Sequence, residues 1–312
     1  MNKSLEAEMK LGNSQGVTPS SKARNRLKDI VRAIRPNQWI KNGFVFLGVV
    51  FSGDWQDPRM FFRVVSATLA FCLVSSAVYV FNDLLDQEND RRHPVKRLRP
   101  IAAGLVSPAV AWLLGVGLVV SGLALGFTIS KVDAIILLVY LAQNIAYSKV
   151  LKRVVLLDVF IVSFGFMLRI LSGTLGVGID PSNWLLLCSM MFTLFIGFGK
   201  RWAELGDSVD ESGSFRPVLN RYNREVLNQF TGICAGGAII TYGLYTLDPA
   251  TVALHHTSNL IYTIPFVIYG IFRYLYLIHT GEGGDPSKLV VRDPHIYVTV
   301  MLWLATVVLI LE

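Results

Sequence analysis

The chain has 312 residues, of which 53% are hydrophobic and 16% are charged, and its formal net charge is +7. Soluble domains carry about 25% charged residues, so this composition excludes an ordinary water-soluble enzyme. The three cysteines lie inside apolar blocks without metal-ligand spacing, which excludes a disulfide framework. Several apolar blocks approach the roughly 20 residues that cross a bilayer. The sequence therefore predicts an all-α, polytopic membrane protein.

Residues 1–35 are polar and basic, and they predict a partly disordered segment without the apolar core of a signal peptide. Residues 36–312 predict a single transmembrane domain built from about nine helices. The expected spans are 36–53, 61–81, 104–127, 132–148, 154–175, 184–200, 227–247, 258–279 and 294–311.

The basic residues predict the orientation of these spans. Most of them precede the first span or fall in the even-numbered connections, whereas the odd-numbered connections hold only Arg59, Arg63 and Lys131. Lysine and arginine accumulate in cytoplasmic loops, so we expect the N-terminus to face the cytoplasm from the plasma or inner membrane. The long charged loops 82–103 and 200–226 then share the cytoplasmic side, where we expect the active site.

The second span runs into a series of oxygen-bearing side chains that ends at Pro94. On one continuous helix these side chains recur three and four residues apart, with Tyr79 one turn before them, so they share a face. Oxygen ligands of this kind suit Mg²⁺, which proteins hold with one or two carboxylates plus substrate phosphate oxygens. The alternative is a solvated helix end at the membrane surface. The expected metal ligands are Asn82, Asp83, Asp86 and Asp90.

Basic residues follow this acidic run at once. Lys96, Arg97 and Arg99 lie directly after Pro94, and a metal site beside a cluster of cations indicates a diphosphate site. A second basic cluster, which includes Lys152, closes the fourth span. Phosphate binding and a positive-inside anchor explain that cluster equally well.

Two cations interrupt apolar spans, and a third cluster closes the sixth span. An arginine inside a membrane is costly, so Arg169 indicates a functional site unless a buried carboxylate pairs with it. Lys41 either contacts a phosphate or extends to the interface. Lys200, Arg201 and Glu204 fall within about one helical turn and can meet one ligand. Glu204 either binds a second metal or holds the two cations in place.

The pattern N-D-x-x-D-x-x-x-D from Asn82 to Asp90 resembles the first signature of the UbiA superfamily of intramembrane prenyltransferases. The resemblance covers 35–311 and implies nine helices around a central cavity that opens to the cytoplasm. Two family elements differ here. The second acidic motif is replaced by Lys200-Arg201-Trp-Ala-Glu204, and the tyrosine-to-lysine element runs from Tyr147 to Lys152, one residue longer than in the family.

These departures resemble the decaprenyl-phosphate phosphoribosyltransferase branch, as does the string Arg35-Pro-Asn-Gln-Trp-Ile-Lys41-Asn42. The resemblance implies an Mg²⁺-dependent transfer of phosphoribose from phosphoribosyl pyrophosphate to a polyprenyl phosphate, which releases diphosphate. The product would be a lipid-linked pentose for cell-envelope glycans. Three anionic groups must then be held together, and extra cations in place of the second acidic motif suit that task.

Each candidate residue has an expected role in that reaction. Asp83, Asp86 and Asp90 are expected to act catalytically through the metal, and Lys96, Arg97 and Arg99 to share the diphosphate charge. For the acceptor phosphate the candidates are Lys41, Tyr79 and Arg169, and for the ribose 5-phosphate they are Lys152, Lys200 and Arg201. The alternatives are prenyl transfer to an aromatic acceptor and a lipid-phosphate or anion carrier. No nucleic-acid partner is expected.

Overall fold

The structure is a computed structural model, and it describes residues 26–52, 57–207, 218–281, 289 and 292–311. Within these ranges every regular element is a helix, which confirms the predicted all-α class. The helices of the first half are α2 (Arg26–Ala33), η1 (Pro36–Phe46), α3 (Leu47–Ser52), α4 (Pro58–Leu85), α5 (Gln87–Arg92), η3 (Lys96–Leu98), α6 (Pro108–Ile129), α7 (Lys131–Lys149) and η4 (Leu151–Arg153). Those of the second half are α8 (Leu157–Ser172), α9 (Asn183–Asp207), η5 (Leu219–Arg221), α10 (Arg224–Leu247), α11 (Pro249–His255), η6 (Asn259–Thr263), α12 (Ile264–His279) and α14 (Pro294–Leu311).

Six stretches in the described part of the chain are long and apolar enough to cross a membrane: α4, α6, α9, α10, η6 with α12, and α14. The other three predicted spans are helical but do not meet that standard. The first begins as a 3-10 helix, and α8 has 16 residues. Asn42 and Arg169, both buried, place polar atoms inside these two segments. Polar contacts therefore shape them as much as length and hydropathy do.

Short local signals fix where the long helices begin. The Asp57 side chain accepts a hydrogen bond from the Arg59 backbone N–H at the start of α4, and Ser107 does the same for Val110 in α6. A proline follows each cap and supplies a backbone angle that suits the first helical turn. The helix ends that carry the charged loops are thus set by the local sequence.

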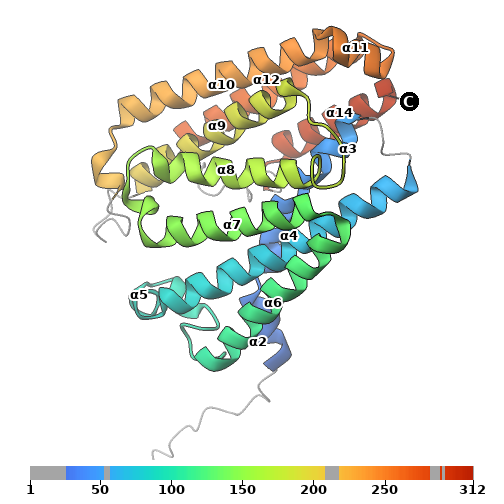
Figure 1. Cartoon of the computed structure of the whole chain (residues 1–312). Helices are drawn as coiled ribbons and strands as arrows, with labels where there is room; N and C mark the ends of the chain where they lie inside the picture. Colours follow the sequence, from blue (N-terminus) through green and yellow to red (C-terminus); the bar gives the residue numbers. More distant parts are fainter. Residues whose placement is uncertain (1–25, 53–56, 208–217, 282–288, 290–291, 312) are drawn as a thin grey trace, which may run out of the picture.

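The helices form two groups that meet at α8 (Figure 1). In one group α4 packs on α6, α7 and η1, and in the other α9 packs on α10 and α12. Helix α8 contacts both α7 and α9 and so lies between the groups. Each group has its own apolar core, which includes the fully buried Phe71 in the first and Phe195 in the second.

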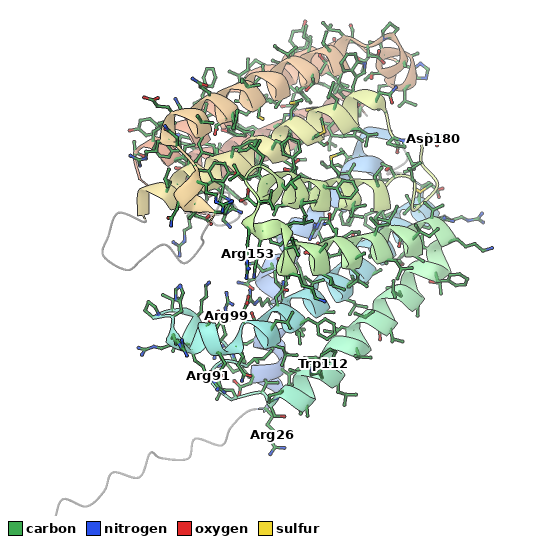
Figure 2. The ribbon with its side chains drawn as sticks, turned by 60° about the vertical axis from the view of Figure 1, so that its left-hand side comes forward. Arg26, Arg91, Arg99, Trp112, Arg153 and Asp180 are labelled. Atoms are coloured by element: carbon green, nitrogen blue, oxygen red, sulfur yellow. The ribbon has the colours of Figure 1, made fainter. Side chains whose placement is uncertain are left out.

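One end of this bundle gathers the charged connections, and we call it the charged end. It comprises the ends of α4, α7 and α9, the starts of α6, α8 and α10, and the short helices α5, η3, η4 and η5. Figure 2 shows Arg99 and Arg153 at this end and Asp180 at the other. Residues from both helix groups therefore approach one another at the charged end.

Candidate active site

The acidic run does not lie on one unbroken helix, contrary to the sequence prediction. Helix α4 ends at Leu85, Asp86 forms a turn, and α5 begins at Gln87. The backbone N–H of Asp86 still donates to Asn82, and that of Asp90 donates to Asp86. The interruption is therefore a local bend at Asp86, and the four oxygen-bearing side chains fall into two sets according to their partners.

Asp83 and Asp90 form the first set, and arginines neutralise both of them. Arg35 Nη2 lies 2.7 Å from Asp83 Oδ2, and Arg99 Nη1 lies 2.6 Å from Asp90 Oδ2 and 3.1 Å from Asp83 Oδ1. Both carboxylates are buried. This network ties the chain before η1 to α4, α5 and the segment after η3, so it fixes the shape of the charged end.

Asn82 and Asp86 form the second set, and they contact the connection between α7 and α8. Ser148 Oγ donates to Asn82 Oδ1 at 2.7 Å, and Lys152 Nζ lies 3.9 Å from Asp86 Oδ1. Asp86 is 44% exposed, whereas Asp83 and Asp90 are almost fully buried. No three acidic, histidine or cysteine side chains converge in the described ranges, so a metal here would need ligands from its substrate.

The three cations predicted to form one cluster after Pro94 do not all face the same way. Lys96 and Arg97 lie on η3, where Arg97 is exposed, whereas Arg99 turns back to the buried carboxylates. His93 Nδ1 accepts hydrogen bonds from the backbone N–H groups of Val95 and Lys96. Burial and the Lys96 charge lower the pKa of His93 below its usual value, which favours the neutral imidazole that accepts these two hydrogen bonds.

This geometry predicts an acid-sensitive turn. As the pH falls below the ordinary histidine pKa of about 6.5, the unfolded chain takes up the proton more readily than the folded one, so the stabilising contribution of His93 is lost. We expect the unfolding midpoint of the purified protein to fall on mild acidification. His93→Asn should reduce that fall, because an asparagine oxygen can accept from the same turn without titrating. An identical acid response in both proteins would contradict this role.

Lys200, Arg201 and Glu204 lie together on α9, as predicted. Arg201 is buried, with Nε 2.6 Å from Asp158 Oδ2 on α8 and Nη1 2.5 Å from Glu204 Oε2. Lys200 Nζ lies 4.0 Å from Glu204 Oε1 and is 36% exposed. Two carboxylates already neutralise Arg201, so Lys200 is the cation of this group with the more accessible side chain. Asp207 and Glu211 also belonged to this region of the sequence, but the Asp207 side chain and all of Glu211 lie outside the described residues.

Arg169 is buried without a carboxylate partner in the part of the chain that the structure describes. Its Nε donates to Asn42 Oδ1 at 2.8 Å, Nη1 to the Gly165 carbonyl at 2.7 Å, and Nη2 to the Tyr140 hydroxyl at 3.1 Å. Aromatic rings also surround the guanidinium within 5.3 Å, namely those of Phe71, Tyr140 and Phe166. Polar oxygens and aromatic ring faces thus stabilise the Arg169 cation without supplying a negative charge that would neutralise it.

Lys41 and Tyr79 both precede the acidic run in the chain, and each lies beside a residue of the contacts described above. Lys41 is half-buried on η1, next to the buried Asn42 that holds Arg169. Tyr79 is half-buried on α4, and the Arg35 guanidinium lies 5.2 Å from the centre of its ring. Arg35 therefore links Tyr79 with Asp83.

Several residues of this site carry no strong signal in the sequence. Arg35 and Asn42 belong to the string that opens the first span, yet nothing there indicates that Arg35 reaches a carboxylate 48 residues away. Ser148 and Tyr222 are single polar residues in loops or at helix ends. Only the packing of distant helices reveals their partners, Asn82 and Asp158.

Comparison with known proteins places this site in a family. Residues 43–308 match the model of the UbiA prenyltransferase family, which is most of the chain. The chain belongs to this family. As a UbiA-family protein with six long apolar helices among its described residues, it is an integral membrane protein.

Relatives of the UbiA-family chain carry a specific name. The decaprenyl-phosphate phosphoribosyltransferase of Mycolicibacterium smegmatis is 34% identical over 297 residues, which covers 91% of this chain and 92% of that protein. The protein of the same name from Mycobacterium tuberculosis H37Rv is 33% identical over 287 residues, with 91% and 94% covered. The resemblance to this branch inferred from the sequence is confirmed.

Solved structures confirm the UbiA fold. A UbiA homologue from Archaeoglobus fulgidus, bound to GPP and Mg²⁺, matches with a TM-score of 0.68 at 17% identity and covers 91% of this chain and 99% of its own. A digeranylgeranylglyceryl phosphate synthase matches with a TM-score of 0.62, also at 17% identity, with 92% and 95% covered. At such identities the likeness establishes the fold alone.

Proposed function

We propose that this enzyme transfers the 5-phosphoribosyl group from phosphoribosyl pyrophosphate to a decaprenyl-type polyprenyl phosphate and releases diphosphate. The observation that carries the proposal is the likeness, over about nine-tenths of the chain, to proteins named for this transfer. The charges of the site support it. Lys200 and Arg201 stand where the family carries its second acidic motif, and the more accessible Lys200 can meet an additional phosphate.

The orientation that suits this substrate places the charged end in the cytoplasm. Lysine and arginine concentrate in the connections at that end, including Lys96 and Arg97 after α5 and Lys152 between α7 and α8. We therefore propose a plasma- or inner-membrane enzyme with a cytoplasmic N-terminal segment, 1–35, and a single transmembrane domain, 36–312. The loops at 82–103 and 200–226 border its active site.

Asn82 and Asp86 are the residues that would hold a divalent metal, which we propose to be Mg²⁺. Their oxygens are hard donors, Asp86 is accessible, and Lys152 lies at 3.9 Å rather than in tight contact. Asp83 and Asp90 assist by fixing Arg35 and Arg99, and they would bind the metal directly only after releasing these arginines. When bound, the metal supplies positive charge to the leaving diphosphate.

The chain's own cations stabilise the same leaving group. Lys96 and Arg97 extend from η3 at the charged end, and Arg99 keeps that segment against the buried acids. As the bond between ribose C1 and the diphosphate oxygen breaks, C1 acquires oxocarbenium character, as in glycoside chemistry. An oxygen of the lipid phosphate then bonds to C1. No protein nucleophile is required, because the acceptor is already an anion.

The remaining cations position the other two phosphates. For the lipid phosphate we propose contacts with Lys41 and Tyr79, while the persisting charge of Arg169 sets a positive potential nearby. For the ribose 5-phosphate we propose Lys152 and Lys200. Arg201 contributes by retaining Glu204, so that Lys200 can move from Glu204 to the phosphate.

A reconstitution tests the reaction itself. Purified protein in detergent is incubated with phosphoribosyl pyrophosphate, decaprenyl phosphate and Mg²⁺, and the lipids are analysed by mass spectrometry. We expect a lipid that has gained one phosphoribosyl unit, its loss with a chelator, and its return when Mg²⁺ is restored. The alternative assay supplies a prenyl diphosphate and 4-hydroxybenzoate. Prenylation of that acid, without any phosphoribosyl lipid, would overturn the proposal.

A further inference from the structure

Tyr222 lies between η5 and α10 and joins three segments at the charged end. It is buried, its hydroxyl donates to Asp158 Oδ1 at 2.6 Å, and the same oxygen accepts from the Leu156 backbone N–H at 2.8 Å. Burial and the Asp158 carboxylate raise the pKa of Tyr222 above its usual value, so the phenol stays protonated and can donate. The phenol thus connects the segment before α10 with the start of α8.

Leu156 is the point at which this connection matters most. Its backbone angles are φ 70° and ψ −48°, a positive-φ conformation that residues with a side chain rarely adopt. Leu156 is the last residue before α8, so its angles set the direction in which the α7–α8 connection leaves that helix. The Tyr222 hydroxyl accepts a hydrogen bond from the backbone N–H of Leu156 in this strained turn, which favours the observed conformation.

The end of α7 and the α7–α8 connection carry side chains that approach the proposed metal ligands. Ser148 donates to Asn82 at the end of α7, and Lys152 lies 3.9 Å from Asp86. A shift of the connection at Leu156 would move Lys152 relative to Asp86, because only three residues separate the two positions. The contacts that hold Leu156 therefore influence the distance between Lys152 and Asp86.

The second branch of the network reaches Lys200. Asp158 is fully buried and accepts from Arg201, and Arg201 donates to Glu204, whose other oxygen lies 4.0 Å from Lys200. Buried charges tolerate little displacement, because each must keep its partner. The network thus connects Lys152 on one segment with Lys200 on another.

We propose that Tyr222, acting through Leu156 and Asp158, is a positioning residue that holds Lys152 against the metal-binding side of the active site. The inference rests on the proposed function. Tyr222 touches neither substrate nor metal in this scheme, and its effect is exerted through the backbone of the α7–α8 connection.

Tyr222→Phe removes the hydroxyl and keeps the ring. We expect kcat to fall about tenfold, as is usual when a group that orients metal-site residues is lost. The Mg²⁺ concentration for half-maximal rate should rise, with little change in KM for the lipid. Tyr262→Phe is the matched control, since Tyr262 lies on η6 and is 69% exposed. It should behave as wild type. Equal kinetics of Tyr222→Phe and wild type would overturn the proposal.

Substitutions at Leu156 separate positioning from general destabilisation. Glycine adopts positive φ without a side-chain clash. Adding Leu156→Gly to the Tyr222→Phe variant should therefore restore part of the kcat that Tyr222→Phe loses. Leu156→Val leaves Tyr222 intact, but its β-branch disfavours the turn, so it should reproduce the kinetic defect. If glycine rescues nothing and valine changes nothing, the connection is not held through Leu156.

A chemical readout keeps this test independent of the reaction. Modification of lysines by a water-soluble amine reagent is measured by mass spectrometry, with the exposed Lys149 as internal reference. We expect Lys152 to react several-fold faster in Tyr222→Phe and Leu156→Val than in wild type, and Tyr262→Phe to show no change. Unchanged Lys152 reactivity would overturn the positioning role. Because this readout needs no substrate, it stays decisive even if wild type makes no phosphoribosyl lipid, which would refute only the proposed function.

Discussion

Asp86→Asn is expected to lower the rate of phosphoribosyl transfer by about 100-fold or more, because the accessible carboxylate of the metal pair is lost. Asp86 is the one acid among Asp83, Asp86 and Asp90 that no arginine contacts in the described structure. Its replacement by the isosteric amide should leave the fold intact. The measurement is product formation by the purified variant over a range of Mg²⁺ concentrations.

Glu88→Gln is the matched control for this experiment. Glu88 is the second residue of α5, is 74% exposed and pairs with Arg91 on the surface of that helix. Removing its charge should change the rate by less than about twofold, since exposed pairs of this kind contribute little. Near-normal turnover by Asp86→Asn, or an equal loss in Glu88→Gln, would show that Asp86 does not hold the metal.

Arg169→Met is expected to reduce both stability and activity. The substitution leaves the buried oxygens of Asn42 and Tyr140 without their donor, and each such group costs about 1–3 kcal/mol. It also removes the positive charge that we assign to the lipid-phosphate region. We expect a lower unfolding midpoint in detergent and transfer that is barely detectable even at temperatures where the variant remains folded.

Arg169→Lys separates the two effects of Arg169. A lysine keeps the charge but cannot repeat the three-way contact of a guanidinium, so it should restore part of the activity and little of the stability. Arg63→Gln is the surface control, since Arg63 donates to the Ile129 carbonyl at an exposed position far from the charged end. Wild-type stability in Arg169→Met would show that the aromatic surroundings hold the fold without the cation.

The order of helices follows from hydropathy, capping and proline signals that are local in the sequence. Helices α4, α6, α10 and α14 begin or end within a few residues of the predicted bounds for this reason. The first span is harder to predict. Its 3-10 segment contains Asn42, which accepts a hydrogen bond from Arg169 on a helix 127 residues away, and local propensity contains no trace of that contact.

The acidic motif illustrates the same division. Its residue types and spacing indicate metal and phosphate chemistry, but they do not tell which carboxylates remain accessible. Asp83 and Asp90 share a buried network with Arg35 and Arg99, while Asp86 lies at a bend beside Lys152. The arginines before η1 and after η3 decide which of these carboxylates are paired and which one stays accessible.

By itself the sequence determined an all-helical membrane protein of the UbiA family, with its charged residues concentrated at one end. These properties depend on composition, apolar block length and short motifs, which are present in this chain before it folds. The tertiary structure alone decided which charges neutralise one another. Pairings such as Tyr222 with Asp158 and Arg169 with Asn42 join residues 64 and 127 positions apart, and only the packing of α8 against its neighbours brings them within hydrogen-bond distance.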